Sequence, residues 1–481
     1  MMKKYYILLI SIIAIGVSSC ENLLDKEPTD KISLEDLFRD VSGSKTALAG
    51  AYHSLLEESH YQKNLMVYPD LLGGNIKFSK TTNLRLEDVY NATQNALEST
   101  MNDTYSYLYS ELNNVNNIIK YTPTAEGSSV EKAKVIAEAK CIRALIHFDL
   151  VRIFARPFNF TPDGSHLGIA VILQPQLFAD PSPVRRTVAQ TYQAIVTDLT
   201  DAIAAFDNTN GGVLKGGYKQ NYFTKSSATA LLAKVYLNQN NWDSAFTLSD
   251  SLIKGNEYTL LTNTNYVASW TGRVPSSESI FELALETSFS STGLGGYFDF
   301  NNTSGYRMFA ATNDLLGLYS DTDVRRNTSM FNTIAISSVN YLFTKKYAAG
   351  GTAATPIKVL RLSELYLIRA EAAAEKNTPD FATANADLNL IRKRGDAAAT
   401  TLSLTVKAAL IDAILLERRK ELAFEGNLLF DLLRKKKDVT RIDATAVNKN
   451  LTTNDNRLIM PLPANTVNAN KFMIQNPGYI N

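Results

Sequence analysis

The sequence predicts a mainly α-helical protein in which tetratricopeptide-type helix pairs are joined by long irregular insertions. Apolar residues recur at three- and four-residue steps along several stretches, and this spacing is typical of amphipathic helices. Between these stretches lie segments rich in Gly, Ser, Thr, Asn and Pro that have little helical period. The chain has 481 residues, 45% of them hydrophobic, which is sufficient to bury one large core or several small ones.

The overall charge of the chain is close to zero. It contains 49 Lys and Arg residues against 48 Asp and Glu residues, which gives a formal net charge of +1. Proteins whose main partner is nucleic acid usually carry a basic excess. We therefore expect no nucleic-acid partner, and the net charge by itself does not indicate a class of substrate.

The first twenty residues have the pattern of an exported lipoprotein. Lys3 and Lys4 precede an apolar run at residues 5–17, which is too short to span a bilayer comfortably. The following VSSC resembles a bacterial lipobox, whose Cys becomes the lipidated first residue after cleavage. We therefore predict a signal peptide at residues 1–19 and lipidation of Cys20. Its acyl chains would anchor the protein, since each buried methylene contributes about 0.8 kcal/mol. A general secretory signal with an incidental Cys is the alternative.

The segment after the predicted cleavage site should be a tether. Residues 20–36 are polar and acidic, and Pro28 interrupts them. Residues 37–481 are predicted to form one globular body. Cleavage leaves Cys141 as the only other cysteine, so no internal disulfide can form. Because Cys141 lies in an apolar helical run, we expect a buried, inert thiol.

The first half of the body is predicted to contain five helical stretches, at residues 33–36, 44–57, 96–121, 131–154 and 188–206. Residues 61–90 are predicted to be irregular, because they contain Pro69 and a Gly-Gly pair. Asn residues crowd positions 113–117, where low helix propensity indicates side-chain hydrogen bonds to nearby backbone. His147 has no second ligand at metal spacing, so we interpret it as a core residue.

Two later segments have the pattern of helix pairs. At residues 225–254, Leu232, Ala233, Tyr236 and Ala245 match positions of a tetratricopeptide pair. Residues 359–394 repeat the arrangement, with a small-residue helix, a polar turn and a second helix. Two such pairs predict a helical-repeat scaffold with long insertions. The aromatic residues between the pairs, within residues 255–355, favour an ordered surface.

Residues 411–434 are predicted to be a helix that carries charge on its apolar stripe. Glu417, Glu421 and Glu425 follow one another at i, i+4 and i+8, where like charges repel unless cations compensate them. Gly426 should interrupt the helix where a bend or a close backbone approach is needed. The nearest candidates for compensation are Arg418, Arg419 and Lys420.

These glutamates admit a catalytic interpretation, because glycosidases use two carboxylates about 5 to 9.5 Å apart. Adjacent arginines, however, lower carboxylate pKa values, whereas a general acid needs a raised pKa. Structural ion pairs are the better interpretation. The sequence contains no Gly-rich phosphate loop, no Cys/His metal cluster and no G-x-S-x-G motif. We therefore predict a binding protein that is not an enzyme and has no cofactor, and the sequence identifies no metal-ligating residues.

The same segment resembles a family signature. The run ERRKELAFEG at residues 417–426, followed by Asp431 and Leu432, is similar to the ERR-ELAFEG-DL motif of the SusD/RagB family of bacterial outer-membrane lipoproteins. The family pattern usually carries Arg where this chain has Leu428. Other segments that resemble the family lie at residues 277–282, 459–463 and 475–479. The resemblance covers essentially the whole mature chain and implies a SusD-like fold, with an N-terminal part at about 37–255 and a C-terminal part at about 256–481.

The resemblance also implies a function. SusD-like proteins sit on the outer face of the outer membrane, bind a nutrient and deliver it to a SusC-like TonB-dependent transporter. We expect a glycan or oligosaccharide as the ligand. A peptide, as in the RagB branch, is an alternative that the low content of two Trp residues keeps open. A tetratricopeptide-type interaction scaffold without a small ligand is a further alternative.

We place the ligand site on two irregular aromatic regions, residues 68–78 and 297–307, which we expect to meet at one face of the scaffold. Loops on a rigid frame are where binding residues concentrate. Aromatic rings there would stack on sugars or pack on peptide side chains, and polar groups would orient the ligand. The alternative is that these aromatics fill cores beneath the loops. The candidate residues are Asp70, Asn75, Lys77, Phe78, Tyr297, Phe300, Tyr306 and Arg307.

Overall fold

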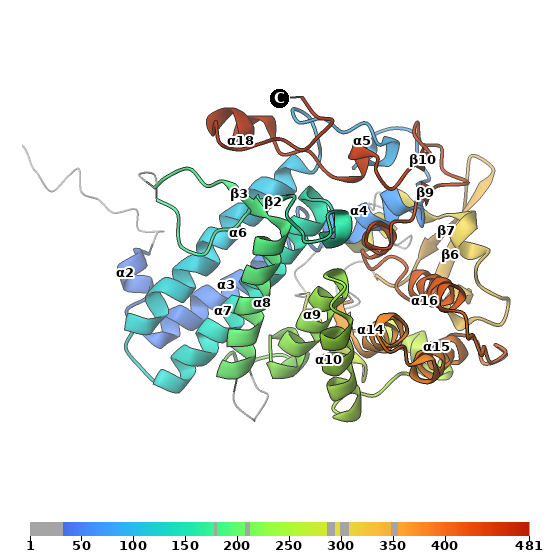
Figure 1. The fold of residues 1–481 in the computed structure, drawn as a ribbon, viewed down its shortest axis with the longest axis horizontal. Coiled ribbons are helices and arrows are strands. Elements are labelled where there is room, and N and C mark those ends of the chain that lie inside the picture. Colours follow the sequence, from blue (N-terminus) through green and yellow to red (C-terminus); the bar gives the residue numbers. More distant parts are fainter. Residues whose placement is uncertain are drawn as a thin grey trace, which may run out of the picture.

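Helices dominate the computed structural model, which confirms the predicted mainly α-helical fold (Figure 1). The structure describes residues 32–177, 180–206, 212–285, 294–298, 307–347 and 355–480. Within these ranges, strands form only five small antiparallel sheets of two strands each.

The first half is built around the long helix α7. The helices of this half are α2 (Leu34–Leu37), α3 (Val41–Ser54), α6 (Asn102–Tyr121), α7 (Ser129–Phe154) and α8 (Val188–Ala205). Helices α3, α6 and α8 all pack against α7, where Ala137, Ala139 and Ala144 allow close contact. The helix predicted from residue 96 begins only at Asn102, because the Asn95 side chain accepts two backbone N–H groups and forms a turn instead.

Two residues of α7 confirm their predicted place in the core. Cys141 is fully buried, and burial raises the pKa of its thiol well above the usual value. His147 is fully buried as well, and burial lowers its pKa to about 3. Its Nε2 atom accepts the backbone N–H of Ile172 at 3.2 Å. Both side chains are therefore structural.

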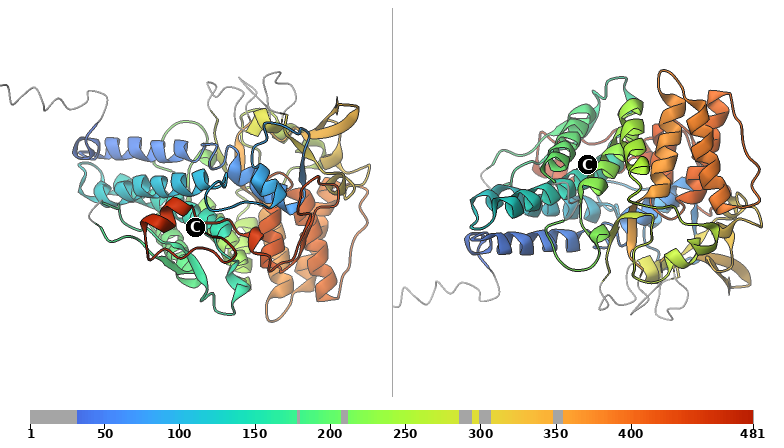
Figure 2. Two further views of the ribbon diagram at one scale, coloured as in Figure 1. Left: turned by 90° about the horizontal axis from the view of Figure 1, so that it is seen from above. Right: turned by 90° about the horizontal axis from the view of Figure 1, so that it is seen from below.

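The predicted helix pairs are present and extend the helical layer. They are α9 (Lys225–Asn238) with α10 (Trp242–Lys254), and α14 (Leu362–Glu375) with α15 (Phe381–Gly395). Each helix in the series α7, α8, α9, α10, α14, α15 packs against the next, and α16 (Lys407–Glu421) packs against α14 and α15. Figure 2 shows the series as a row across the molecule. Asn241 and Asp380 cap the second helix of each pair. This row confirms the helical-repeat scaffold.

The insertions supply the strands and the short helices. The paired strands are β1 (Ile76–Phe78) with β5 (Phe309–Ala311), β2 (Leu167–Ala170) with β3 (Arg185–Thr187), β4 (Ser279–Leu283) with β8 (Ile357–Arg361), β6 (Phe331–Ile336) with β7 (Val339–Thr344), and β9 (Val439–Thr440) with β10 (Asn450–Leu451). The short helices are α4 (Asn64–Gly73), α5 (Glu87–Asn91), α11 (Asn263–Tyr266), α12 (Leu294–Phe298), α13 (Asn313–Leu316), α17 (Leu428–Arg434) and α18 (Ala464–Ala469). Single 3₁₀ turns lie at Thr122–Thr124, Phe158–Phe160, Lys219–Asn221, Ala268–Trp270, Val324–Arg326 and Asn456–Leu458.

The prediction that residues 61–90 are irregular is wrong over α4. All ten residues of this helix are buried, although Pro69 removes one backbone hydrogen bond from its interior. The burial of its apolar side chains offsets that loss, since a fully buried Leu or Val contributes about 1.5–3 kcal/mol. Gly74, with φ of +104°, ends the helix.

The segment predicted as one interrupted helix consists of α16, a turn and α17. Gly426 lies in that turn with φ of +70°, and a Cβ atom there would lie 2.6 Å from the carbonyl oxygen of Leu65. The turn therefore presses against α4 so closely that only Gly fits. This contact confirms the close backbone approach predicted at Gly426.

Candidate functional site

The three glutamates of the signature lie in a buried network of ion pairs. Arg361 contacts Glu421 at 2.5 Å and Glu425 at 2.7 Å, while Arg325 contacts Glu417 at 2.6 Å. All five side chains are no more than 5% exposed. Further cations of the network are Lys346, which binds Glu425, and Arg394, which binds Glu421.

These cations correct the prediction that neighbouring residues compensate the glutamates. Arg418 instead binds Asp431 at 2.8 Å, and Arg419 binds Asp314 at 2.6 Å. Only Lys420 contributes locally, at 3.9 Å from Glu417. The reason is geometric, because residues adjacent in a helix point to different faces. The compensating cations come from segments 25 or more residues away in the chain.

The network holds the carboxylates of Glu421 and Glu425 ionised. Burial raises the pKa of Glu425, but Arg361 and Lys346 more than offset it and hold the pKa below its ordinary value. The same balance, with Arg394, Arg361 and Arg325 as the main cations, lowers the pKa of Glu421. A general acid must keep its proton near neutral pH. These two carboxylates therefore have a structural role, as the sequence predicts.

The two regions predicted to carry the ligand site do meet. Strand β1 pairs with β5 in antiparallel register, with Phe78 opposite Phe309. The Ser79 hydroxyl donates to the backbone carbonyl of Arg307 at 2.5 Å. Residues 68–78 and the described part of 297–307 thus lie side by side.

Of the six predicted site residues that the structure describes, four have buried side chains. Asp70 and Asn75 are fully buried, and Asp70 accepts the Gly426 backbone N–H at 3.0 Å. Phe78 stacks on Phe309 with ring centroids 5.9 Å apart, and Tyr297 lies 5.6 Å from the same ring. These contacts hold the insertions to the scaffold, in the manner of aromatics that fill a core beneath loops.

Two of the predicted residues are nearer to solvent. Lys77 is half-buried and its Nζ atom lies 2.7 Å from Asp443, and Arg307 is half-buried with φ of +46°. Phe300, Tyr306 and the predicted lipidation site Cys20 lie outside the described residues. The assignment of ligand contacts therefore stays a prediction.

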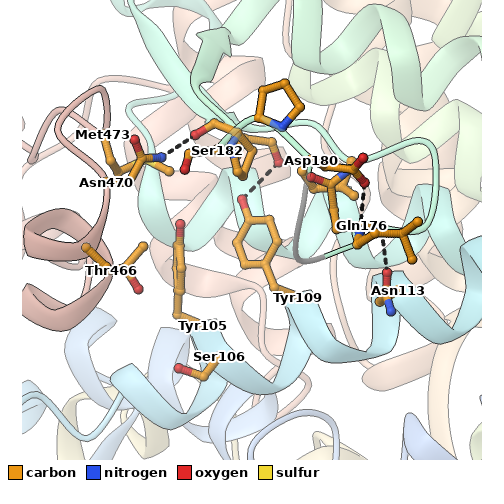
Figure 3. A pocket seen from close by; sticks show the side chains of 16 residues that line it. Tyr105, Ser106, Tyr109, Asn113, Gln176, Asp180, Ser182, Thr466, Asn470 and Met473 are labelled. Carbon is orange, nitrogen blue, oxygen red and sulfur yellow. Dashed lines mark hydrogen bonds between the residues drawn. The ribbon is translucent and has the colours of Figure 1, made fainter.

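A cavity of about 480 Å³ lies elsewhere, between α6, the loop that joins β2 to β3, and the segment around α18 (Figure 3). Tyr105, Tyr109 and Asn113 of α6 form one side of it. Their four-residue spacing was the available signal in the sequence, but it also fits a core stripe. The sequence analysis therefore missed the cavity, although Tyr105 is also a buried residue of the core.

The described ranges contain neither a candidate metal site nor a candidate membrane-spanning helix. No group of three or more His, Cys, Asp or Glu residues there could hold a metal ion. Within the same part of the chain, no helix is long and apolar enough to cross a membrane.

A row of stacked helices with irregular insertions fastened to it by a buried ionic network defines a helical-repeat binding protein. The comparisons with known proteins agree. One family model, described as the SusD family, matches residues 299–479, and a second, described as starch-binding and associating with outer membrane, matches residues 23–237. Two models of SusD-type proteins thus match separate parts of this chain, and together these parts make up most of its length.

The similarity to individual proteins extends over most of the chain. A crystal structure of a SusD superfamily protein from Bacteroides vulgatus is 26% identical, with a TM-score of 0.81 over 92% of this chain and 100% of that one. A putative sugar binding protein from the same organism is 27% identical, with a TM-score of 0.79 over 92% and 99%. SusD-like protein P38 of Formosa agariphila is 26% identical over 54% of this chain and 48% of its own length, and P25 is 23% identical over 90% of both.

Proposed function

We propose that this protein is a lipid-anchored outer-membrane protein that binds a nutrient glycan at the cell exterior and delivers it to a SusC-like TonB-dependent transporter. The observation that carries the proposal is the similarity over nearly the whole chain to a putative sugar binding protein of known structure. The family model described as starch-binding and associating with outer membrane supports it as well. SusD-like proteins are binding proteins, and a role without catalysis agrees with the lowered pKa values of Glu421 and Glu425.

The proposed ligand site is the surface beside β1 and β5. The half-buried side chains of Lys77 and Arg307 would supply polar contacts there, together with the aromatic rings of Phe300 and Tyr306. Arg307 supports this placement, because a non-glycine residue with positive φ is strained, and such strain concentrates at functional sites. The buried Asp70, Asn75, Phe78 and Tyr297 would hold the frame of the site from below.

A peptide ligand is the second candidate, and the state of the Trp residues favours it. Trp270 is 1% exposed, with the cations of Lys346 and Lys358 each 4.5 Å from its ring centre. Trp242 is half-buried. Neither Trp side chain is therefore fully exposed for stacking on a sugar. A glycan would have to stack on Tyr and Phe rings instead.

Isothermal titration of the purified protein against panels of glycans and peptides tests the proposal. We expect a glycan to bind, and the double variant Phe300→Ala/Tyr306→Ala to weaken that binding at least about tenfold, which is 1.4 kcal/mol. The control is Phe160→Ala, which removes an aromatic ring that is 45% exposed outside the proposed site. Binding of peptides alone would favour the second candidate, and no binding in either panel would contradict both.

Delivery to the transporter has its own test. Purification of the tagged protein from outer membranes solubilised in detergent should bring down a large β-barrel protein. Repeated absence of such a partner, while ligand binding is intact, would leave a surface binding protein that acts without a transporter.

A further inference from the structure

The cavity beneath the β2–β3 loop is a preformed space on the first half of the molecule. Its lining comes from α6, β2, the segment between β2 and β3, and the region of α18. In Figure 1 these elements lie away from β6 and β7, which are on the right. Figure 3 shows Tyr105 and Tyr109 extending side by side from α6 toward the loop. Their ring centroids are 4.6 Å apart at an angle of 47°. Helix α6 thus presents two adjacent aromatic rings to the cavity.

The first part of the β2–β3 loop, up to residue 176, is held in place by polar side chains of α6. Tyr109 donates to the carbonyl of Ala170 at 2.9 Å, and Asn116 donates to the carbonyl of Ile172 at 3.0 Å. Asn113 accepts the backbone N–H of Gln176 at 2.7 Å. These bonds give a role to two of the four Asn residues at positions 113–117. They order this part of the loop over the cavity without a ligand, so that binding loses less conformational entropy.

The far wall is fixed as well. Asn470, just after α18, donates to the carbonyl of Pro183 at 2.6 Å, so the C-terminal segment and the second part of the loop are joined. The Asn470 and Met473 side chains are buried and line the cavity. Three segments that are far apart in sequence therefore line one open cavity of about 480 Å³, within the range of small-molecule sites.

The side chains that line the cavity are suited to a neutral ligand that carries hydroxyl groups. Among the described residues that line the cavity there is no Lys, Arg or His, and Asp180 has the one carboxylate. An anionic ligand would therefore find no cation to pair with. Tyr105, Tyr109 and Met473 supply apolar surface. The described part of the chain provides no hydrogen-bond partner for the hydroxyls of Ser106 and Ser182 or for the side-chain nitrogen of Asn113, so these groups are available to a ligand.

We propose that this cavity is a second binding site, separate from the surface beside β1 and β5, and that it takes a neutral saccharide of one or two rings. The aromatic side suits the apolar face of a pyranose ring, and the hydroxyl and amide groups suit its hydroxyls. The volume accommodates a ligand of this size. The proposal depends neither on the transporter nor on the site proposed above.

The test uses one blocking variant and a control from the same helix. Ser106 and Ser110 are both exposed residues of α6, but only Ser106 lines the cavity. Ser106→Trp should place a large ring at the cavity mouth, and Ser110→Trp should not. Maltose, cellobiose and diacetylchitobiose are titrated as saccharide probes, with trialanine as a peptide probe. The protein is the full-length chain in a detergent without a sugar head group, in the Phe300→Ala/Tyr306→Ala background.

We expect at least one saccharide to bind with a dissociation constant of about 10 mM or tighter, Ser106→Trp to weaken it at least about tenfold, and Ser110→Trp to leave it unchanged. Both variants should melt like their parent. The proposal is overturned if none of the three saccharides binds, if Ser106→Trp has no effect, or if trialanine is the ligand that Ser106→Trp displaces. Loss of binding from the Phe300→Ala/Tyr306→Ala change alone would concern only the site beside β1 and β5.

Discussion

Arg361 is fully buried and reaches three carboxylates, those of Glu278, Glu421 and Glu425. A buried pair repays the loss of hydration only when geometry and hydrogen bonding are good, and removal of one partner leaves an uncompensated charge. The network therefore fastens β4, β8 and the α16–α17 turn to one another. Its stabilising effect is easiest to detect by deletion of a single charge.

Glu421→Gln should lower the free energy of unfolding by about 3–5 kcal/mol, because the charges of Arg361, Arg325 and Arg394 would lose a shared partner. Urea denaturation of the purified protein measures this. The matched control is Glu87→Gln at an exposed position, which should change stability by no more than about 0.5 kcal/mol. Equal stability of the two variants would contradict a structural role for the network.

The ion pair between Glu371 and Arg434 makes the free energy of unfolding depend on pH in the acid range. Burial raises the pKa of Glu371, but Arg434, at 2.5 Å, and Lys435 outweigh it and lower the pKa to about 2 from an ordinary 4.5. A lowered pKa stabilises the fold above pH 4.5, and this contribution disappears as the pH falls toward 2. Glu371→Gln should therefore be less stable than the parent by about 3 kcal/mol at pH 7, and the difference should shrink between pH 4.5 and 2. A difference independent of pH would refute the lowered pKa.

The sequence predicted that the glutamates are paired, but not with which cations. Like charges at i, i+4 and i+8 on an apolar stripe require compensation, and that inference depends only on helix geometry. The identity of Arg325, Arg361 and Arg394 as partners depends on how distant segments fold together, which local spacing does not encode. Burial of Asp70 and Asn75 escaped prediction for the same reason.

At the scale of elements, prediction succeeded where a segment carries its own signals. The helix pairs have internal periodicity and short polar turns, so their bounds follow from the sequence. Helix α4 failed because Pro69 and the Gly-Gly pair indicate a break, while the burial that stabilises the helix comes from α17 and the rest of the core. The sequence predicted that the two irregular regions meet, but not that β1 pairs with β5 as strands. These strands have three residues each, too few to show a period, and they lie more than 200 positions apart.

The turn between α16 and α17 should tolerate only Gly at position 426. Gly426→Ala forces a side chain into positive φ and against the Leu65 carbonyl, so we expect a loss of at least about 1–3 kcal/mol in denaturant unfolding. Gly50→Ala is the control, because Gly50 is exposed in α3 with open space around its Cα atom. That change should stabilise the protein by about 0.5–1 kcal/mol through helix propensity. Similar effects at both positions would mean that the close approach to α4 is not a constraint.

At the scale of the molecule, the geometry of the described body fits attachment through its N-terminal end. Helix α2 lies at one end of the long axis and α15 at the other (Figure 1). The twelve residues from 20 to 31 can span at most about 40 Å when fully extended. An anchor at Cys20 would thus keep the α2 end near the membrane and allow the body to move above it.

Cys20→Ala tests the anchor directly. Without Cys20 the proposed lipid anchor cannot form, so the protein should leave the outer-membrane fraction. Cell fractionation followed by immunoblotting measures the distribution. The matched control is Cys141→Ala, which removes a buried thiol and should leave the protein in the membrane fraction. An unchanged outer-membrane yield for Cys20→Ala would show that attachment does not depend on lipid, and the tether would then need a different partner at the surface.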